Sequence, residues 1–313
     1  MAQTTGQRRQ QANMDIKQLR FLEALAEEKH FGRAAAACFV TQPTLSARIR
    51  QLEDELGLPL IQRGNRFEGL TPEGERILGW ARRVLVNYAG LYQEVATVKG
   101  TLAGQLRLGI VPSALPFSAR LTMPFMRAHP AASIHSISRT ADEITKSLES
   151  FALDLGIAYL DREVPDTLQT LELYPESYVL LVPEGEYFPD RDSVSWQEAA
   201  SLPLCLLSKG MHNRHLIESA FQAAGCDVEP QFQSNSFLAL YSHVSNGYWA
   251  TIAPGFHARI AGLNQGVAAI PLVEPAVVHP VGLLWRQDEP LSPLVSAFIA
   301  QSRQHLVAET QPA

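Results

Sequence analysis

A seam of apolar residues near the end of the first hundred positions constrains the fold more than any other feature. Its members are Ile77, Ala81, Val84, Tyr88, Leu91, Val95 and Val98, at alternating spacings of four and three. This heptad pattern predicts one helix that begins at Thr71-Pro72, lasts about four heptads and ends before Gly100. A lone helix cannot bury such a stripe on itself, so we expect it to pair with its copy in a second chain. The alternative is packing against its own domain only.

Composition indicates an ordinary globular protein with material for about two or three domains in 313 residues. No apolar run reaches the roughly 18 residues that a membrane span needs. Residues 1–13 are polar and lack the apolar segment of a secretory signal, so they predict a flexible tail and a cytoplasmic protein without a membrane partner. The three cysteines show no C-x-x-C spacing, so we expect reduced thiols and neither a metal site nor a cofactor.

The net charge of −6 is distributed unevenly. Residues 1–100 hold 14 Lys and Arg against 11 Asp and Glu, whereas the rest hold 12 against 21. A basic N-terminal part and an acidic C-terminal part favour different binding partners for the two parts of the chain.

Three short helices are predicted between residues 14 and 60. The third is the most informative, because Thr41 is a good N-cap, Pro43 suits the first turn, and Gly57 ends the helix. Its apolar stripe leaves a small, hydroxylated and basic face turned outward. The segment 59–74 then reads as a β-hairpin, or wing, with Arg63 and Arg66 at its tip.

After Gly104 the pattern changes to alternating strands and helices, which indicates an α/β domain. We expect strands at 105–111, 133–138, 153–159, 178–182, 203–207, 251–254, 267–270 and 277–285. Helices are expected at 116–128, 141–151, 212–224 and 236–246, with a terminal helix from Pro293. Two lobes with a ligand site between them, at the strand C-termini, are typical of such a pattern.

The stretch FGRAAAACFVTQPTLSARIRQLEDELGLPLIQRGNRFEGLTPEG resembles the winged helix-turn-helix of LysR-type transcriptional regulators. The residues that fall at the family's spacing are Ala34, Ala35, Gln42, Pro43, Leu45, Ser46, Leu52, Glu53, Leu56, Gly57, Leu60, Arg63, Leu70, Thr71 and Gly74. Ile61 stands where Phe is usual. The resemblance implies a winged domain at 14–72 (helix-turn-helix 31–50), a linker and dimerisation helix at 73–100, and a two-lobed, periplasmic-binding-protein-like α/β effector domain at 104–305. Lobe I would hold about 104–174 and 275–305, and lobe II about 175–274.

The implied function is a homodimeric or homotetrameric regulator that binds promoter DNA, responds to a small effector and contacts RNA polymerase. A recognition helix inserts its N-terminal residues into the major groove. The expected DNA-binding residues are Gln42, Pro43, Thr44, Ser46, Ala47, Arg48 and Arg50, with Arg63, Arg66 and Thr71 on phosphates. Arg48 has the alternative of an ion pair on a solvated face.

The resemblance also implies an effector, expected to be anionic, against two helix starts and one turn. The expected effector-binding residues are Ser113, Ala114, Thr140, Ser208, His212 and Arg214, with Lys209 adding positive charge. Thr140 has a structural alternative, since Thr140-Ala141-Asp142-Glu143 is a capping box. Trp249 replaces a usual glycine, and we expect its bulk to narrow the cleft.

Three other functions compete with this one. Enzyme motifs such as G-x-S-x-G, the P-loop, G-x-G-x-x-G and H-E-x-x-H are missing from the sequence, which argues against catalysis. A cysteine-based redox switch is an alternative, but His212 occupies the loop where one branch of the family carries a reactive thiol, and the pKa of Cys205, inside an apolar strand, should be raised. A solute-binding protein without a DNA role would leave the winged motif unexplained.

Overall fold

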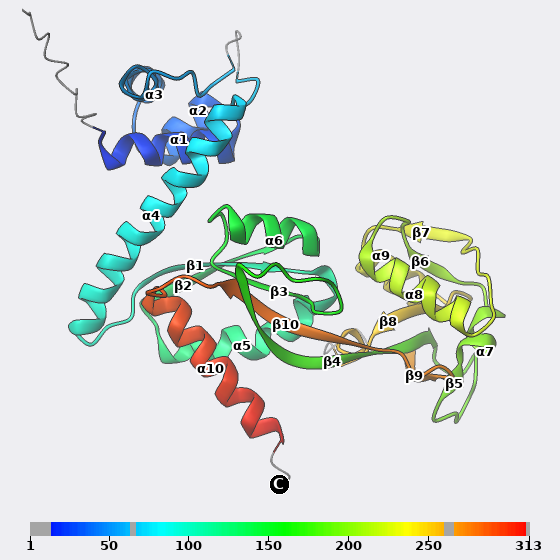
Figure 1. The fold of residues 1–313 in the computed structure, drawn as a ribbon. Helices are drawn as coiled ribbons and strands as arrows, with labels where there is room; N and C mark the ends of the chain where they lie inside the picture. The colour runs from blue at the N-terminus through cyan, green and yellow to red at the C-terminus, as the bar shows by residue number, and fades with distance from the viewer. Residues whose placement is uncertain (1–13, 63–66, 260–265, 311–313) are drawn as a thin grey trace, which may run out of the picture. The chain divides into compact units, whose positions relative to one another are not determined.

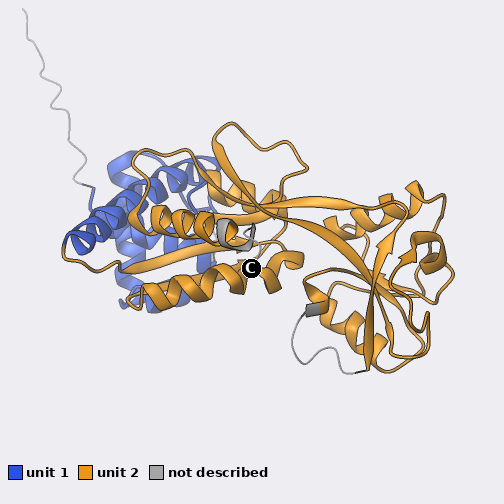
Figure 2. Cartoon of the chain, turned by 90° about the horizontal axis from the view of Figure 1, so that it is seen from below, with its two compact units in different colours: residues 1–98, 150–152 blue, residues 99–149, 153–313 orange. Residues whose placement is uncertain are grey.

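The computed structural model describes residues 14–62, 67–259 and 266–310, and the chain forms two compact units (Figure 1). One unit contains residues 1–98 with 150–152, and the other contains 99–149 and 153–313 (Figure 2). Across the described ranges, no helix combines the length and the apolarity needed to cross a membrane.

Three short helices open the first unit, as the sequence predicted: α1 (Ile16–Glu28), α2 (Phe31–Ala37) and α3 (Gln42–Leu56). α3 starts at the expected cap, where the hydroxyl of Thr41 accepts a hydrogen bond from the Thr44 amide at 3.4 Å. It ends at Gly57, whose φ of +68° is the left-handed conformation that glycine adopts at little cost. The buried faces of the three helices share one core, so the opposite face of α3 is left to solvent.

The wing is anchored at its base by contacts that the motif residues make. Ile61 and Leu70 form an antiparallel bridge, while Arg63 and Arg66 lie outside the described residues. The buried carboxylate of Glu53 accepts hydrogen bonds from the amides of Leu60 and Ile61, at 2.7 and 3.1 Å. These bonds fasten the end of α3 to the first strand of the wing.

The long helix α4 (Pro72–Val98) starts and ends where the sequence predicted, but its seam divides into two parts. Ala81 is buried in the core of its own unit, and Ile77 packs against that core. The later seam residues Val84, Leu91, Val95 and Val98 are exposed, with Leu91 at 61% and Val98 at 81%. The core of the unit therefore covers only the first part of the seam, and the second part stays bare in a single chain.

The second unit is the expected α/β structure, built on a mixed eight-stranded sheet. Along the sheet the order is β2-β1-β3-β10-β4-β9-β5, and β8 also pairs with β4. The strands are β1 (Gly104–Ile110), β2 (Ala132–Ser138), β3 (Leu155–Tyr159), β4 (Leu168–Pro183), β5 (Val194–Ser195), β8 (Thr251–Pro254), β9 (Val267–Val273) and β10 (Val278–Arg286). A separate parallel pair consists of β6 (Cys205–Leu207) and β7 (Phe232–Ser234).

Helices cover these strands in two groups, which define two lobes (Figure 1). Lobe I carries a short 3-10 turn, η1 (Pro112–Ala114), and the helices α5 (Leu115–Ala128), α6 (Ala141–Glu149) and α10 (Pro293–Thr310). Lobe II carries α7 (Trp196–Ala200), α8 (His212–Ala223), α9 (Phe237–Ser245) and the turn η2 (His257–Arg259). Separate apolar cores fill lobe I and lobe II.

Two long strands join the lobes. β4 pairs with β10 from Leu168 to Ser177 and then with β8 and β9 from Tyr178 onward. The sequence predicted a strand only at 178–182 and missed 168–177, because Glu172, Pro175 and Glu176 interrupt the apolar alternation. Residues 168–177 are the half of β4 that pairs with β10, and they continue without a break into the half that pairs with β8 and β9 in lobe II.

Candidate functional site

The residues expected to read DNA lie on the outward face of α3. Exposed there are Gln42, Pro43, Thr44, Ala47, Arg48 and Arg50, and Ser46 is half-buried. Arg48 donates to Gln51 at 3.1 Å, and Gln51 donates to Glu55 at 2.8 Å, so this arginine is held along its own helix. Arg50 makes no hydrogen bond or ion pair with a described residue. Its guanidinium is therefore available to a base edge or a phosphate.

The hydroxyl of Thr71 is already engaged at the start of α4. It donates to the carbonyl of Pro59 at 2.7 Å and accepts from the amide of Gly74 at 2.9 Å. These two bonds cap the helix and fix the end of the wing, so the side chain has a structural role at this position.

A pocket of about 120 Å³ lies between the two lobes of the second unit. Lobe I contributes Val111, Pro112, Ser113, Thr140, Ala141 and Tyr159, and the residues from lobe II include Leu207, Met211, His212, Asn213, Phe237 and His257. The starts of η1, α6, α8 and α9 all meet there. Two hydrogen bonds between described residues join the lobes at the pocket. His257 Nε2 lies 3.1 Å from the carbonyl oxygen of Ser113, and Asn213 Nδ2 lies 3.0 Å from the hydroxyl of Tyr159.

Three of the six residues expected at the effector site are brought together in this pocket, and three are not. Ser113, Thr140 and His212 line it. Ala114 is fully buried in the core of lobe I, and Ser208 does not reach the pocket wall. Trp249, which was expected to narrow the cleft, does not line it either; it packs beside Phe232 and His243 within lobe II.

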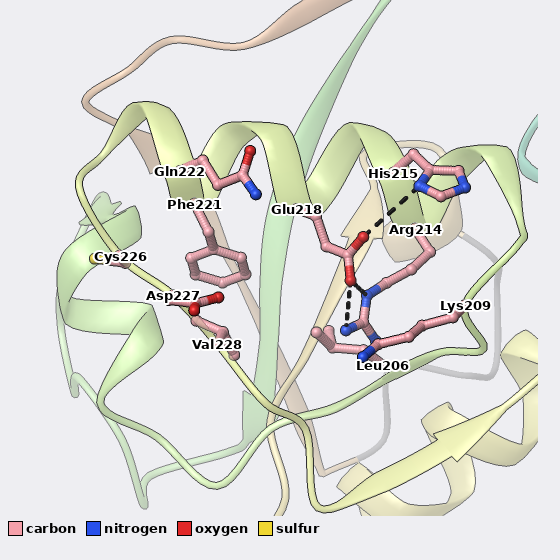
Figure 3. Close-up of a pocket in the computed structure, with 10 residues that line it drawn as sticks. All are labelled: Leu206, Lys209, Arg214, His215, Glu218, Phe221, Gln222, Cys226, Asp227 and Val228. Atoms are coloured by element: carbon pink, nitrogen blue, oxygen red, sulfur yellow. Dashed lines mark hydrogen bonds and ion pairs between the residues drawn. The ribbon is translucent and has the colours of Figure 1, made fainter.

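Arg214 points away from the space between the lobes. It lines a different pocket of about 270 Å³ in lobe II, between α8 and the chain around Cys226 (Figure 3). Its guanidinium is buried, donating to Glu218 at 2.9 Å and to the carbonyl of Leu207 at 3.0 Å. Lys209 lines this second pocket as well. Neither of these cations lines the inter-lobe pocket, because the first turn of α8 directs His212 and Asn213 there instead.

Thr140 forms the capping box that its sequence allowed. Its hydroxyl donates to Glu143 at 3.0 Å and accepts from the Glu143 amide at 3.3 Å, and its own amide donates to the same carboxylate at 2.9 Å. These bonds hold the pKa of Glu143 below its usual value, so a carboxylate stands at the start of α6, beside the pocket.

Beneath the pocket lies a buried polar cluster that the sequence did not reveal. The phenols of Tyr159 and Tyr174 donate to the carboxylate of Glu176, which is 1% exposed. Asn213 Nδ2 lies 3.0 Å from the hydroxyl of Tyr159 and 3.4 Å from that of Tyr178. Burial raises the pKa of Glu176 to about 7, and the two phenols lower it in part.

Burial lowers the pKa of two histidines of the pocket. Burial lowers the pKa of His257 to about 4, and the bond to Ser113 only partly opposes this. Burial also lowers the pKa of His212, against the attraction of Asp161. Among the described residues no lysine or arginine lines the pocket.

The one thiol near this region is poorly reactive. Burial raises the pKa of Cys205 to about 11, as expected for a cysteine inside an apolar strand. Cys38 and Cys226 are half-buried and unpaired with each other.

The sequence missed Tyr159, Asn213 and His257 as pocket residues. Tyr159 carried a usable signal, because it ends a buried strand where ligands of α/β folds collect. His257 follows β8 in the same way. Nothing in the local sequence of Asn213 distinguishes it from an exposed polar residue of α8 such as His215.

A winged helix-turn-helix joined to a two-lobed α/β domain with a pocket defines a ligand-responsive DNA-binding regulator, and comparison with known proteins gives the family. Residues 16–75 match the bacterial regulatory helix-turn-helix of the lysR family, and residues 99–307 match the LysR substrate binding domain. The chain therefore belongs to the LysR family of transcriptional regulators.

Two relatives illustrate this membership. The DNA-binding transcriptional dual regulator OxyR of Escherichia coli (strain K12) is 31% identical over 280 residues, which cover 89% of this chain and 91% of that protein. The hydrogen peroxide-inducible genes activator of Haemophilus influenzae is 30% identical over 282 residues, covering 89% and 92%.

Solved structures agree with the fold. A full-length OxyR variant from Pseudomonas aeruginosa has a TM-score of 0.74 at 25% identity, covering 93% of this chain and 98% of that one. CbnR, a LysR family regulator, has a TM-score of 0.68 at 20% identity, covering 94% and 99%. The second likeness bears on the fold alone.

Proposed function

We propose that this regulator binds promoter DNA through the outward face of α3 and that a small effector in the inter-lobe pocket controls the binding. The observation that carries the effector role is the pocket itself, whose wall comes from both lobes, while the chain passes between the lobes along β4 and β10. A ligand that contacts both walls has a different affinity for each separation of the lobes. Its binding therefore shifts the equilibrium between the more open and the more closed arrangement of the lobes.

The exposed face of α3 supports the DNA role. Gln42, Ser46 and Arg50 offer an amide, a hydroxyl and a guanidinium near the start of one helix, and these groups suit base edges and phosphates. Arg63 and Arg66 of the wing are proposed to contact phosphates, which set affinity more than sequence preference.

The bare second part of the α4 seam supports assembly. Leu91 and Val98 would be covered if two copies of α4 packed together, and we propose a homodimer built on this helix, with a homotetramer as the complete assembly. We further propose that the protein acts in the cytoplasm without catalysis and that its bound form contacts RNA polymerase.

The effector role is tested at Thr140, an exposed residue at the mouth of the pocket. Thr140→Trp fills the mouth, and Thr140→Ala is its matched control, because both changes remove the same capping hydroxyl. Thermal-shift screening against metabolites should find compounds that raise the melting temperature of the parent and of Thr140→Ala but not of Thr140→Trp. Equal responses of both variants would place the effector outside the pocket.

A redox response is a second candidate, since the relatives include hydrogen peroxide-inducible activators. The raised pKa of Cys205 opposes it, because the thiolate is the reactive form. Peroxide treatment followed by mass spectrometry should leave the three thiols reduced at doses that oxidise a free cysteine in solution. Stoichiometric oxidation of one of them, with altered operator binding, would favour the redox function instead.

A further inference from the structure

Two buried hydrogen-bond acceptors without donors stand at the inter-lobe pocket. Asn213 Oδ1 and His257 Nδ1 belong to side chains that are 7% exposed, and neither atom has a partner among the described residues. An unsatisfied buried polar atom costs about 1 to 3 kcal/mol, so such atoms are normally paired. Both residues line the pocket, and together they specify what a ligand must offer.

The proton of His257 can be assigned from its neighbour. Its Nε2 lies 3.1 Å from the carbonyl oxygen of Ser113, and a carbonyl only accepts, so Nε2 carries the hydrogen. The pKa lowered to about 4 leaves this ring neutral at physiological pH. Nδ1 then carries an unprotonated lone pair, and only a hydrogen-bond donor can satisfy it.

The orientation of the Asn213 amide follows from the cluster beneath it. Tyr159 donates its proton to Glu176, so the phenol oxygen is free to accept, and Nδ2 of Asn213 lies 3.0 Å from it. The same nitrogen also faces the hydroxyl of Tyr178 at 3.4 Å. The amide nitrogen therefore donates to the tyrosine hydroxyls, and the carbonyl oxygen Oδ1 remains as a second acceptor that faces the pocket without a partner among the described residues.

The pocket wall offers a negative ligand no full positive charge from a lysine or arginine of the described chain, so only the backbone at the starts of η1, α6, α8 and α9 would favour one. The hydroxyl of Thr140 donates to Glu143, whose carboxylate stands at the start of α6, and no lysine or arginine of the described chain lines the pocket. A carboxylate or oxyanion placed there would meet two lone pairs and a neighbouring negative charge. The buried hydroxyl of Ser113 has no hydrogen-bond partner at normal distance among the described residues and can act as donor or acceptor.

The size and the remaining wall define the rest of the ligand. Val111, Leu207 and Phe237 give the pocket an apolar side, and its volume of about 120 Å³ is close to that of cavities that accept a single benzene ring. A full positive charge would lose its hydration in exchange for two neutral acceptors on the wall, which is unfavourable, because Glu143 does not line the pocket and is already bonded to Thr140 and close to Arg139.

We propose that the effector is a compact, uncharged molecule with an apolar body and N–H or O–H donors, of the class of primary amides and phenols, and that Asn213 and His257 select it. This inference rests on the proposed function only in placing the effector in this pocket. It replaces the anionic effector that the sequence suggested, because the expected cation Arg214 faces another part of lobe II.

The test uses the full-length chain and pairs of probes that differ only in the polar end: benzamide against benzoate, and butyramide against butyrate. Titration calorimetry at pH 7.5 should give the amide of each pair an affinity at least about tenfold higher than the carboxylate, the effect of one well-formed hydrogen bond against an unsatisfied one. Equal affinities, a preference for the carboxylates, or binding by neither member would overturn the proposal.

Variants then connect the preference to the two acceptors. His257→Phe keeps a ring against Phe237, whose centroid is 4.1 Å away, but removes the lone pair, and His215→Phe is the control on the exposed side of α8. His257→Phe should lower benzamide affinity about tenfold or more, while His215→Phe leaves it unchanged. Unchanged binding by a folded His257→Phe would refute the assignment.

Failure of this inference can be told apart from failure of the proposed function. Carboxylates that bind the parent and Thr140→Ala but not Thr140→Trp would keep the effector site and overturn only the ligand class. Amides that bind the parent and both Thr140 variants equally would show that the inter-lobe pocket is not the effector site.

Discussion

The phenol of Tyr159 donates a hydrogen bond to the buried carboxylate of Glu176. Tyr159 ends β3 and lines the pocket, whereas Glu176 lies in the half of β4 that continues from one lobe to the other. On the adjacent strand, His279 pairs in register with Glu176 and bonds Asp161 at 2.9 Å. Tyr159 therefore connects the pocket directly to Glu176. A change in hydrogen bonding at the pocket acts through this one side chain on a strand that joins the two lobes.

Glu176 should make folding stability depend on pH. Its pKa is about 7 in the folded chain against 4.5 for an ordinary glutamate, so the folded state holds this proton more tightly. The resulting stability is fully present below about pH 4.5 and is lost as the pH rises through about 7. The shift corresponds to about 3 kcal/mol. Glu176→Gln cannot ionise and should flatten the fall in unfolding free energy between pH 5 and 8, measured by urea denaturation.

Glu172→Gln is the control for this experiment, because Glu172 is an exposed carboxylate on the same strand. It should retain the pH dependence of the parent. A parent whose stability rises from pH 5 to 8, or a Glu176→Gln variant with an unchanged slope, would show that Glu176 is ionised throughout.

Gly74 should be irreplaceable at the start of α4. A Cβ at this position would lie 2.1 Å from the carbonyl oxygen of Leu60, which is backbone and cannot rotate away. Gly74→Ala should lower the melting temperature of the winged unit, at a cost of about 1 to 3 kcal/mol, and weaken operator binding. Gly79→Ala, in the same helix with nothing within 4 Å, should instead stabilise by up to about 1 kcal/mol. Equal melting temperatures for the two variants would contradict this packing.

Arg50 and Arg48 should differ in their contribution to DNA binding. Arg50 is free of hydrogen bonds within the described chain, whereas Arg48 is tied to Gln51. Arg50→Ala should cost about 1 to 3 kcal/mol in operator affinity if it contacts a base, with a smaller loss on random DNA. Fluorescence anisotropy with both DNAs gives the comparison, and Arg191→Ala in lobe II serves as control. A loss of the same size on operator and random DNA would reassign Arg50 to a phosphate.

The exposed part of the α4 seam should mediate dimerisation. Val84→Glu with Leu91→Glu would bury unpaired carboxylates between paired helices, so the chain should sediment as a monomer. Ala89→Glu with Thr97→Glu adds the same charge at exposed positions off the seam and should leave the assembly intact. A double seam variant that sediments like the parent would mean that another surface holds the copies together.

What the sequence by itself determined is local. Thr41, Pro43 and Gly57 set the bounds of α3, and the motif from Gln42 to Gly74 identified the winged domain, because caps, turns and apolar spacing act over a few residues. Most of the strands and helices after Gly104 followed from the same short-range patterns, but the short elements β5, α7 and β7 did not.

The tertiary structure alone decided the polarity of the pocket and the course of β4. Because Glu172, Pro175 and Glu176 interrupt the apolar alternation, the sequence did not predict the first half of β4. Only the pairing of this half with β10 shows that Glu176 is buried. Arg214 and Asn213 are neighbours in sequence, yet consecutive helical residues point about 100° apart. Arg214 therefore faces Glu218 in lobe II, and Asn213 faces Tyr159 and Tyr178. Which of two adjacent side chains enters a pocket depends on how the helix packs, and that packing is made by residues far away in the chain.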